Sequence, residues 1–384
     1  MKIVHLCLCG PVTDNWNYQD NLLSKYHKRL GYDVNMITSK WVWNNEGKLE
    51  LDTRTEYIND DGIKIIRLDI LGEKHFDKKF KRYVGVYNAI ESCAPDILFI
   101  HGCQFMDIDV VVEYLKRNKS VIVYLDNHAD FSNSATNFIS KNILHKIIWK
   151  SKAQNILPYV KKFYGVLPAR VDFLVDIYQV PEDKVELLVM GADDDKVINA
   201  INNIKNRNLR GQFGIQEDDF LIVTGGKIDL AKSQTLLLME AVKKIKNFKV
   251  KLIVFGSVAE ELKIKFNSLI DNEYVHYAGW ISAEESYDYF ASADLVIFPG
   301  RHSVFWEQVA AQGIPMIVKY WEGTDHIDIG GNVRFLYEDS VEEIYKEIVN
   351  LIHNKNEYQK MKKISQEKGL QYFGYSKIAT YSIK

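Results

Sequence analysis

Short apolar runs alternate with longer amphipathic stretches along the first half of the chain. The apolar runs are residues 3–8, 33–38, 63–68, 97–100 and 121–125. Strands separated by helix-length segments pair in parallel through crossover helices, so we expect a doubly wound α/β domain. Within residues 57–67, Asp61-Gly62 stands between two β-rich runs and predicts a hairpin. We expect both of its arms at one edge of the sheet.

The same alternation returns in the second half. Its apolar runs are residues 220–224, 250–255, 275–277, 295–298 and 316–319, and the polar, asparagine-rich stretch 193–210 precedes them. We expect one domain over residues 1–192, completed by a C-terminal helix at about 368–384, and a second over 193–367. Ligands bind outside the carboxyl ends of strands in such sheets, so two facing sheets predict a cleft between the domains.

Composition excludes several classes of protein. The chain has 384 residues, 47% of them apolar, which suffices for two packed cores, and its formal charge of -2 argues against a nucleic-acid partner. Four cysteines form no disulfide framework or zinc motif, so we expect a reduced, cytoplasmic protein. Because no run approaches the roughly 18 apolar residues that span a bilayer, we expect membrane association, if any, to be peripheral.

A loop between the run 220–224 and the next helical pattern carries Gly226, Lys227 and Lys232. Ammonium groups and backbone N–H groups at such a strand-to-helix loop are suited to phosphate oxygens. Each charge-assisted hydrogen bond contributes about 1.5–3 kcal/mol. We therefore predict that the two lysines bind a nucleotide diphosphate, against the alternative of a solvated basic loop.

The order of the motifs is more specific than any one of them. The lysine loop is followed by Phe255-Gly256-Ser257, then by the segments 276–280 and 293–299, and then by Glu307 and Gly313-Ile314-Pro315. This order resembles the GT-B glycosyltransferases of family 4. In the first half, the segments 31–34 and 123–128 are similar to that family's second strand and to its strand that ends in a histidine.

The resemblance implies a GT-B architecture, with two Rossmann-like parallel-sheet domains, and a hexosyltransferase of polysaccharide biosynthesis. It implies a nucleotide-diphosphate sugar as co-substrate, a carbohydrate or lipid-linked glycan as acceptor, retention of configuration, and neither metal nor other cofactor. It also implies roles for individual residues. Lys227, Lys232 and His128 are its candidates for catalysis, and the donor-binding candidates are Gly10, Gly226, Lys227, Lys232, Gly256, Ser257, Trp280, His302, Ser303, Val304 and Glu307.

Two positions depart from the family. Lys227 stands where arginine is usual, which keeps the charge but loses the bidentate geometry. Glu307 resembles the glutamate that holds the nucleotide ribose, yet Pro299 stands where the family has the glutamate that contacts donor-sugar hydroxyls. His302 or Arg301 is expected in that space. The alternatives are that Glu307 only complements a helix dipole and that His302 only neighbours the helix start.

In the first half, Gly10 begins a loop with one glycine and no G-x-G-x-x-G, which argues against a dinucleotide oxidoreductase. Gly10 either approaches the transferred sugar or forms a plain turn. Three further candidates for the acceptor side, His101, Asp126 and Asp130, lie at strand ends. The resemblance places His128 near the reacting carbon, with a structural histidine as the alternative. The aspartates would be candidate bases only if configuration were inverted.

Two acidic stretches, Asp193-Asp194-Asp195 and residues 325–328, could be drawn as metal sites. We reject the first because it lies at the expected hinge, and the second because it lacks a helical histidine pair, which leaves a solvated loop. The stretch 131–171 has no Asp or Glu, and its lysines interleave with apolar residues. Together with the basic segment 74–82, it predicts contact with an anionic membrane surface, against the alternative of a core-facing helix with a basic edge.

Two rival functions remain at this stage. A GT-B nucleotide-sugar epimerase would isomerise the donor and need no acceptor. A non-catalytic GT-B partner subunit would bind a nucleotide sugar and turn nothing over without another transferase.

Overall fold

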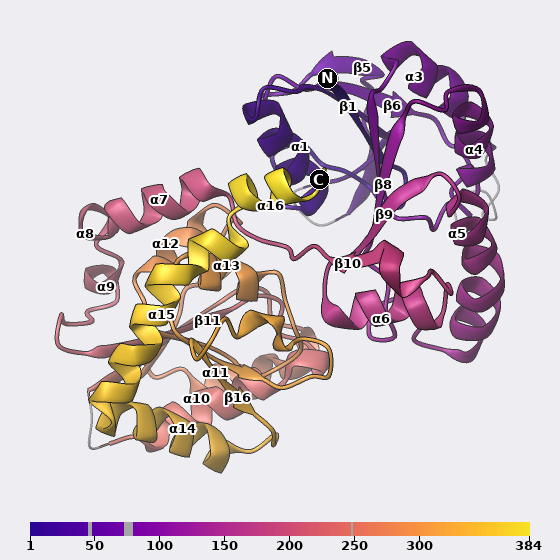
Figure 1. Cartoon of the computed structure of the whole chain (residues 1–384). Helices are drawn as coiled ribbons and strands as arrows, with labels where there is room; N and C mark the ends of the chain where they lie inside the picture. The colour runs from indigo at the N-terminus through magenta and orange to yellow at the C-terminus, as the bar shows by residue number, and fades with distance from the viewer. Residues whose placement is uncertain (45–47, 73–79, 247–248) are drawn as a thin grey trace. The chain divides into compact units, whose positions relative to one another are not determined.

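A computed structural model describes residues 1–44, 48–72, 80–246 and 249–384 (Figure 1). The chain divides into two compact units. Unit 1 contains Met1–Met190 and Ile378–Lys384, and unit 2 contains Gly191–Lys377. The last seven residues therefore return to the unit in which the chain begins.

Unit 1 is built on an eight-stranded sheet in the order β10-β9-β8-β7-β1-β2-β6-β5. All neighbouring pairs are parallel except the antiparallel pair β5–β6 at one edge. Its strands are β1 Lys2–Cys7, β2 Asp33–Ser39, β5 Glu56–Ile58, β6 Lys64–Leu68, β7 Ile97–His101, β8 Ile122–Asn127, β9 Val160–Gly165 and β10 Val185–Leu187. A separate two-stranded ribbon pairs β3 Trp41–Trp43 with β4 Leu49–Leu51.

Successive side chains of the central strands point to opposite faces of this sheet, and the two faces carry different kinds of residue. Val4, Leu6 and the equivalent residues of β7 and β8 join a large apolar core on one face. That core also receives residues of α3 Val86–Cys93, α4 Ile108–Arg117, α5 Lys150–Ile156 and α6 Pro168–Asp176. The opposite face carries His5, Phe99 and Tyr124, whose rings stack in a row. Helix α1, Gln19–Arg29, and the C-terminal residues contact this second face.

Unit 2 is built on a six-stranded, wholly parallel sheet in the order β13-β12-β11-β14-β15-β16. Its strands are β11 Phe220–Gly225, β12 Val250–Phe255, β13 Val275–Tyr277, β14 Leu295–Phe298, β15 Met316–Lys319 and β16 Val333–Leu336. One face packs on α10 Gln234–Lys244 and α14 Val341–His353. On the other face, an aromatic cluster joins Phe255 and Phe298 to α12 Glu285–Ala291 and α13 Phe305–Ala311.

The other α-helices described in unit 2 are α7 Asp194–Asn202, α8 Ile204–Arg207, α9 Leu209–Gln212, α11 Lys263–Leu269 and α15 Lys355–Phe373. Of these, α11 and α15 add residues to the core. A last helix, α16 Tyr375–Tyr381, leads the chain back into unit 1 beside α1 (Figure 1). There, Ala379 O and Ser382 Oγ lie 3.1 and 3.0 Å from His27 Nε2.

The ten strands expected from the apolar runs are confirmed within one or two residues at each end, and so is the hairpin, whose Gly62 has a φ of 73°. One boundary differs, because His101 lies inside β7 rather than after it. The pattern missed β3, β4, β9, β10 and β16. Within the stretch 131–171, where a helix with apolar and basic positions was expected, residues 140–149 form a wider π-helical segment that continues into α5.

The first prediction concerns the backbone contact that shapes the edge of unit 2. Gly256 has a φ of 119°, and a Cβ there would lie 1.9 Å from the carbonyl oxygen of Gly226. We expect Gly256→Ala to destabilise the chain by more than the roughly 1–3 kcal/mol of backbone strain alone, as measured by urea unfolding. Gly10→Ala is the control, because no atom lies within 4 Å of its added Cβ. Equal stability of the two variants would contradict this view of the loop.

Candidate functional site

The connections of the unit 2 sheet change direction between β11 and β14. The chain runs from β11 outward to β12 and β13, and later from β14 outward to β15 and β16. Loops that leave two adjacent strands in opposite directions leave room between them at the carboxyl edge, which is where ligands of such sheets bind. The predicted lysine loop follows β11, and the segment Pro299–Val304 follows β14. The topology therefore brings these two predicted segments together.

A pocket lies at this point of the sheet. Lys227 and Lys232 line one part of it, and Arg301 and Ser303 line another. The other lining residues are Thr224, Gly225, Ile228, Thr235, Phe298, Pro299 and Gly300. The lining thus holds three cations and no carboxylate. The two threonines were missed by the sequence analysis, and Thr235 could have been suspected only from its place one turn after Lys232.

The two lysines have different surroundings. The side chain of Lys227 is 72% exposed, and its Nζ lies 3.4 Å from a carboxylate oxygen of Asp229. Burial lowers the pKa of Lys232, the neighbouring Asp229 raises it, and Lys227 lowers it further, with a net lowering. A partly desolvated ammonium group beside a second cation is stabilised by an incoming anion. The arrangement favours a ligand with at least two negative charges.

Two glycines bring the β11 and β12 loops into contact. Gly226 N–H donates to Phe255 O over 3.1 Å, and Gly256 N–H donates to Gly279 O over 2.7 Å. Both glycines have a φ of 119°. Of the other predicted donor-binding residues on this side, Ser257 is exposed and Trp280 is 68% exposed. The loops of β13, β12, β11 and β14 are therefore neighbours, although Trp280 and Ser257 do not line the pocket.

Glu307 lies in α13 with no exposed surface, and two histidines contact it. His302 Nε2 and His326 Nε2 lie 2.8 and 3.0 Å from the same oxygen, Oε1. Burial acts to raise the pKa of Glu307, but the two histidines lower it well below its ordinary value. Its other oxygen, Oε2, is buried and has no hydrogen-bond partner among the described residues. The carboxylate is enclosed rather than presented to the pocket, and the ribose contact expected of it is not tested.

This cluster corrects one expectation. Residues 325–328 were predicted to be a solvated loop, but His326 is almost fully buried and its side chain contacts Glu307. The sequence pattern missed this because the two residues are distant in the chain. The rejected acidic run is also ordered: Asp193 is buried and caps α7 by accepting from Asp195 N, and Asp194 accepts from Ser376.

The predicted residues of unit 1 gather where its own sheet changes direction, between β1 and β7. His101 Nδ1 lies 2.8 Å from Asp126 Oδ2, and His128 Nε2 lies 3.4 Å from Asp126 Oδ1. Burial acts to raise the pKa of Asp126, but His101 and His128 lower it well below its ordinary value. His128 is the most accessible of the three, with 38% of its side chain exposed.

Asp130 is held in a different way. Its Oδ2 accepts from Arg170 Nε over 3.0 Å, and its Oδ1 accepts from the backbone and hydroxyl of Ser132. It is 4% exposed. Both oxygens are engaged, so the structure favours a loop-stabilising ion pair over a role for Asp130 as a base. Gly10, by contrast, has open space around it.

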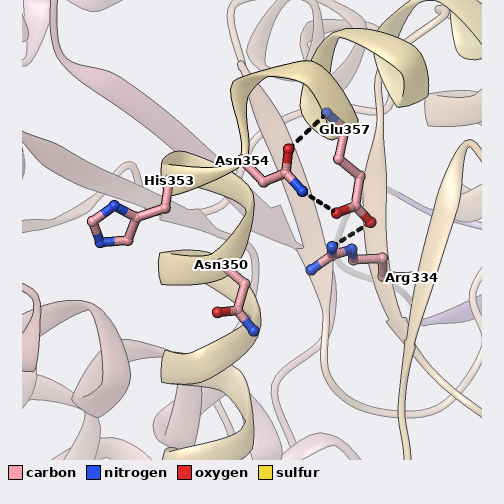
Figure 2. A pocket seen from close by; sticks show the side chains of 5 residues that line it. All are labelled: Arg334, Asn350, His353, Asn354 and Glu357. Carbon is pink, nitrogen blue, oxygen red and sulfur yellow. Dashed lines mark hydrogen bonds and ion pairs between the residues drawn. The ribbon is translucent and has the colours of Figure 1, made fainter.

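A second cavity, of about 440 Å³, lies between β16, α14 and α15 in unit 2 and contains none of the predicted residues. Figure 2 shows Arg334 turned toward Glu357, with which it forms an ion pair, while Asn354 donates to the same carboxylate over 3.0 Å. A further oxygen, from Glu347, lies 2.8 Å from Arg334. Because the guanidinium is already paired, this cavity is a poor anion site.

Residues 219–354 match the model of the family Glycosyl transferases group 1. The uncharacterized glycosyltransferase MJ1607 of Methanocaldococcus jannaschii is 24% identical over 178 residues, which are 44% of this chain and 46% of the relative. The chain thus matches about half the length of this curated relative.

Solved structures match the whole chain at low identity. A glycosyltransferase from Rickettsia africae superposes with a TM-score of 0.68 at 13% identity, over 99% of this chain and 96% of that one. Anabaena Alr3699/HepE in complex with UDP gives 0.68 at 14%, over 99% and 98%. The UDP-GlcNAc 2-epimerase of Neisseria meningitidis gives 0.59 at 13%, over 99% and 98%. The predicted GT-B fold is confirmed, and the family model that residues 219–354 match agrees with the resemblance to family 4.

The second prediction concerns the enclosed carboxylate. Glu307→Gln retains one oxygen for the two histidines but removes the charge that they face, so we expect a loss of stability of roughly 1–3 kcal/mol. Glu307→Ala leaves both rings without an acceptor and should cost more, about 3–5 kcal/mol. Urea unfolding at pH 7 measures both. Gln308→Ala is a control in the same helix, since it removes one neutral hydrogen bond, to Ser286. A stability of Glu307→Ala equal to that of the wild type would contradict the buried pairing.

Proposed function

We propose, because residues 219–354 match the model of the family Glycosyl transferases group 1, that this chain transfers a sugar from a nucleotide-diphosphate sugar to a carbohydrate or lipid-linked glycan acceptor. The reaction proposed is metal-independent and retains configuration at the sugar. Unit 2 binds the nucleotide, and unit 1 supplies the groups near the reacting sugar and the acceptor. This proposal adds a donor, an acceptor and a reaction to the fold and to the family match of residues 219–354.

One observation carries the proposal: the pocket between the β11 and β14 loops contains Lys227, Lys232 and Arg301 and no carboxylate. In sugar transfer, negative charge accumulates on the departing diphosphate. Preorganised cations in a partly dry site stabilise that charge more than water does, and removing one such group costs about 100-fold or more in rate. Two lysines and an arginine supply this stabilisation without a metal ion.

In unit 1, His128 is the accessible group beside a buried carboxylate. Asp126 Oδ1 lies 3.4 Å from His128 Nε2, and among the described residues neither atom makes a hydrogen bond, which leaves Nε2 free for a ligand. His128 therefore donates to the sugar in this mechanism, and the leaving phosphate takes the acceptor proton. Gly10, whose surroundings are open, allows the sugar to approach the backbone after β1.

The two rival functions predict different chemistry with the donor alone. An epimerase isomerises the sugar nucleotide without an acceptor, and its fold is also represented among the structural neighbours. A partner subunit binds the sugar nucleotide but neither transfers nor isomerises it. Incubation of the purified chain with sugar nucleotides, with and without acceptor, and product analysis by chromatography separates the three functions.

The third prediction tests the cationic pocket. Nucleoside diphosphates should raise the melting temperature of the wild-type chain, because a ligand that binds only the native state stabilises it by RT ln(1 + [L]/Kd). Lys232→Glu should abolish the shift, and Lys232→Met should weaken binding by roughly 10-fold or more, as expected for one lost charge-assisted bond.

The control for this prediction is Lys244→Met, which removes an exposed lysine at the opposite end of α10 in the same unit. An unchanged shift in Lys232→Glu would refute the diphosphate site. If the melting-temperature shift were lost in Lys244→Met as well, the anion would be attracted nonspecifically by the net charge of the unit.

An exposed surface of unit 1 supports the further proposal that the enzyme works at an anionic membrane surface. Phe138, Ile139, Ile143 and Ile147 are between 45% and 77% exposed. Leu144 and Ile148 pack against the core, so the segment is anchored on its other side. Four accessible apolar side chains at helical spacing, next to cations, are typical of segments that lie in the headgroup region.

The cationic part of this surface is smaller than expected. Lys152 pairs with Asp109, Lys162 with Glu186 and Arg170 with Asp130, so these three cations are engaged within the protein. Lys141 and Lys146 remain beside the apolar row. Of the other predicted basic segment, residues 74–79 lie outside the described part of the chain. No helix in the described ranges is long and apolar enough to cross a membrane.

The fourth prediction tests this surface. The double variant Phe138→Asp with Ile147→Asp should reduce cosedimentation with vesicles that contain phosphatidylglycerol by about 10-fold or more, because it removes two apolar anchors and adds repulsion. Ile264→Asp is the matched control, because Ile264 is 89% exposed but lies in unit 2. Equal vesicle binding by the wild type and the double variant would overturn the proposal, and the donor-binding assay would be unaffected by that result.

A further inference from the structure

Three buried histidines of unit 1 form an unbroken hydrogen-bonded row. His5 and His27 have no exposed surface, and His101 is 3% exposed. His101 Nε2 lies 2.9 Å from His5 Nδ1, and His5 Nε2 lies 3.0 Å from His27 Nδ1. We call these three side chains the histidine row.

The sequence explains why the row forms. His5 is on β1 and His101 on the adjacent β7, and alternation points both to the face that α1 covers. His27 reaches them from the last turn of α1. None of the three stands in a local motif: the parallel pairing of β1 with β7 brings His5 and His101 together, and the packing of α1 on this face adds His27.

The groups that neighbour the two ends of the row can only accept hydrogen bonds from it. At one end, His101 Nδ1 lies 2.8 Å from Asp126 Oδ2 and 3.6 Å from Asp20. At the other end, His27 Nε2 lies 3.1 Å from the carbonyl oxygen of Ala379. The nearby Ser382 hydroxyl donates to that same carbonyl over 3.0 Å, so it is an acceptor toward His27.

These contacts fix the number of protons. Four contacts, from Asp126 to Ala379, each need one proton on a ring nitrogen. Three neutral imidazoles carry only one proton each. The row is therefore fully hydrogen-bonded only when it holds one proton more than three neutral rings do.

The surroundings place this extra proton on His101. The titratable groups that face it are His5 and Cys7 from β1, Asp20 and His27 from α1, and Asp126 and His128 from β8 and the residue after it. Burial raises the pKa of Cys7, so its thiol stays neutral. The two carboxylates are then the charges nearest His101.

The pKa directions agree with this placement. Burial lowers the pKa of His101, but Asp126 and Asp20 outweigh it, and the net pKa is raised. Burial lowers the pKa of His27 to about 4, and it lowers that of His5 in the same direction. His5 and His27 therefore stay neutral with the proton on Nε2.

We propose that His101, His5 and His27 are positioning residues that share one extra proton and thereby hold Asp126 ionised and directed at His128. This inference rests on the proposed function for its consequence, because His128 is the group that would meet the sugar. The row acts as one unit. Loss of the extra proton leaves three protons for four contacts, so one hydrogen bond must break, and Asp126 loses its cationic partner.

The proton count is tested without any assay of activity. In wild-type chain with ¹⁵N-labelled histidine rings, NMR at pH 7 should show His101 with protons on both nitrogens, and His5 and His27 with a proton on Nε2 alone. The signals are assigned by substituting the other histidines one at a time, so that the row stays intact. A singly protonated His101, or a proton on Nδ1 of His5 or His27, would overturn the inference.

The positioning role is tested by the pH dependence of sugar-nucleotide turnover, which is the fifth prediction. His101 has a raised pKa, so its charged form is present at low pH and is lost as the pH rises through that value. Wild-type turnover should fall over this range. His101→Asn keeps a donor toward Asp126 but no charge, and it should lower turnover by about 10-fold or more and remove this limb of the profile.

His145→Asn is the control, because His145 is another buried histidine of unit 1 and contacts only Tyr178 by hydrogen bond among the described residues. Its profile should keep the limb. A limb that persists in His101→Asn would overturn the positioning role. If the wild type turns over no sugar nucleotide, the proposed function fails, while the NMR result still decides whether the row holds its extra proton.

Discussion

Where a parallel sheet changes the direction of its connections, two adjacent loops part and leave polar backbone and side chains uncovered at the carboxyl edge. Both units of this chain depend on that constraint. In unit 2 the change lies between β11 and β14, and in unit 1 it lies between β1 and β7. The lysines stand at the first point, and His101 and Asp126 stand near the second. Neither group would be assembled by local sequence alone.

The strands that flank these points were the easiest to predict. Residues 220–225 and 250–255 are nearly continuous apolar runs because both faces of their sheet are covered by helices. Strand β9 was missed because Lys161 and Lys162 interrupt its pattern, each paired with a partner far along the chain. The ribbon β3–β4 was missed because each of its strands has only three residues and most of those residues are accessible to solvent.

The site was predictable to the extent that it follows strand ends. Lys227, Lys232 and Ser303, which follow β11 and β14, line one pocket, and their role in donor binding stays a prediction. His326 was not predictable, because its contact with Glu307 depends on how the loop after β15 folds over α13. The histidine row was missed for the same reason: His5 and His27 look like ordinary residues of a strand and a helix. Long-range hydrogen bonds between buried polar groups leave no periodic signal in a sequence.

The chain encloses two carboxylates, and in both cases histidines are the neighbouring side chains. Asp126 and Glu307 are both fully buried, and each is held by two histidines. A buried carboxylate with such partners is fixed in charge and orientation, because an unpaired ion there would cost several kcal/mol. The difference lies in access. His128 remains partly exposed beside Asp126, whereas His326 is closed off beside Glu307.

The surroundings of these carboxylates bear on how the donor sugar would be recognised in the proposed reaction. The unit 2 pocket presents cations, and Pro299 supplies no carboxylate for sugar hydroxyls. One oxygen of Glu307, Oε1, is already paired with His302 and His326, and the other, Oε2, is buried. Cations attract phosphate but discriminate poorly among neutral hydroxyl patterns, which need matched donors and acceptors. In the proposed reaction, the cations of this pocket therefore supply affinity for the diphosphate, whereas recognition of the sugar requires donors and acceptors that the lining of this pocket lacks.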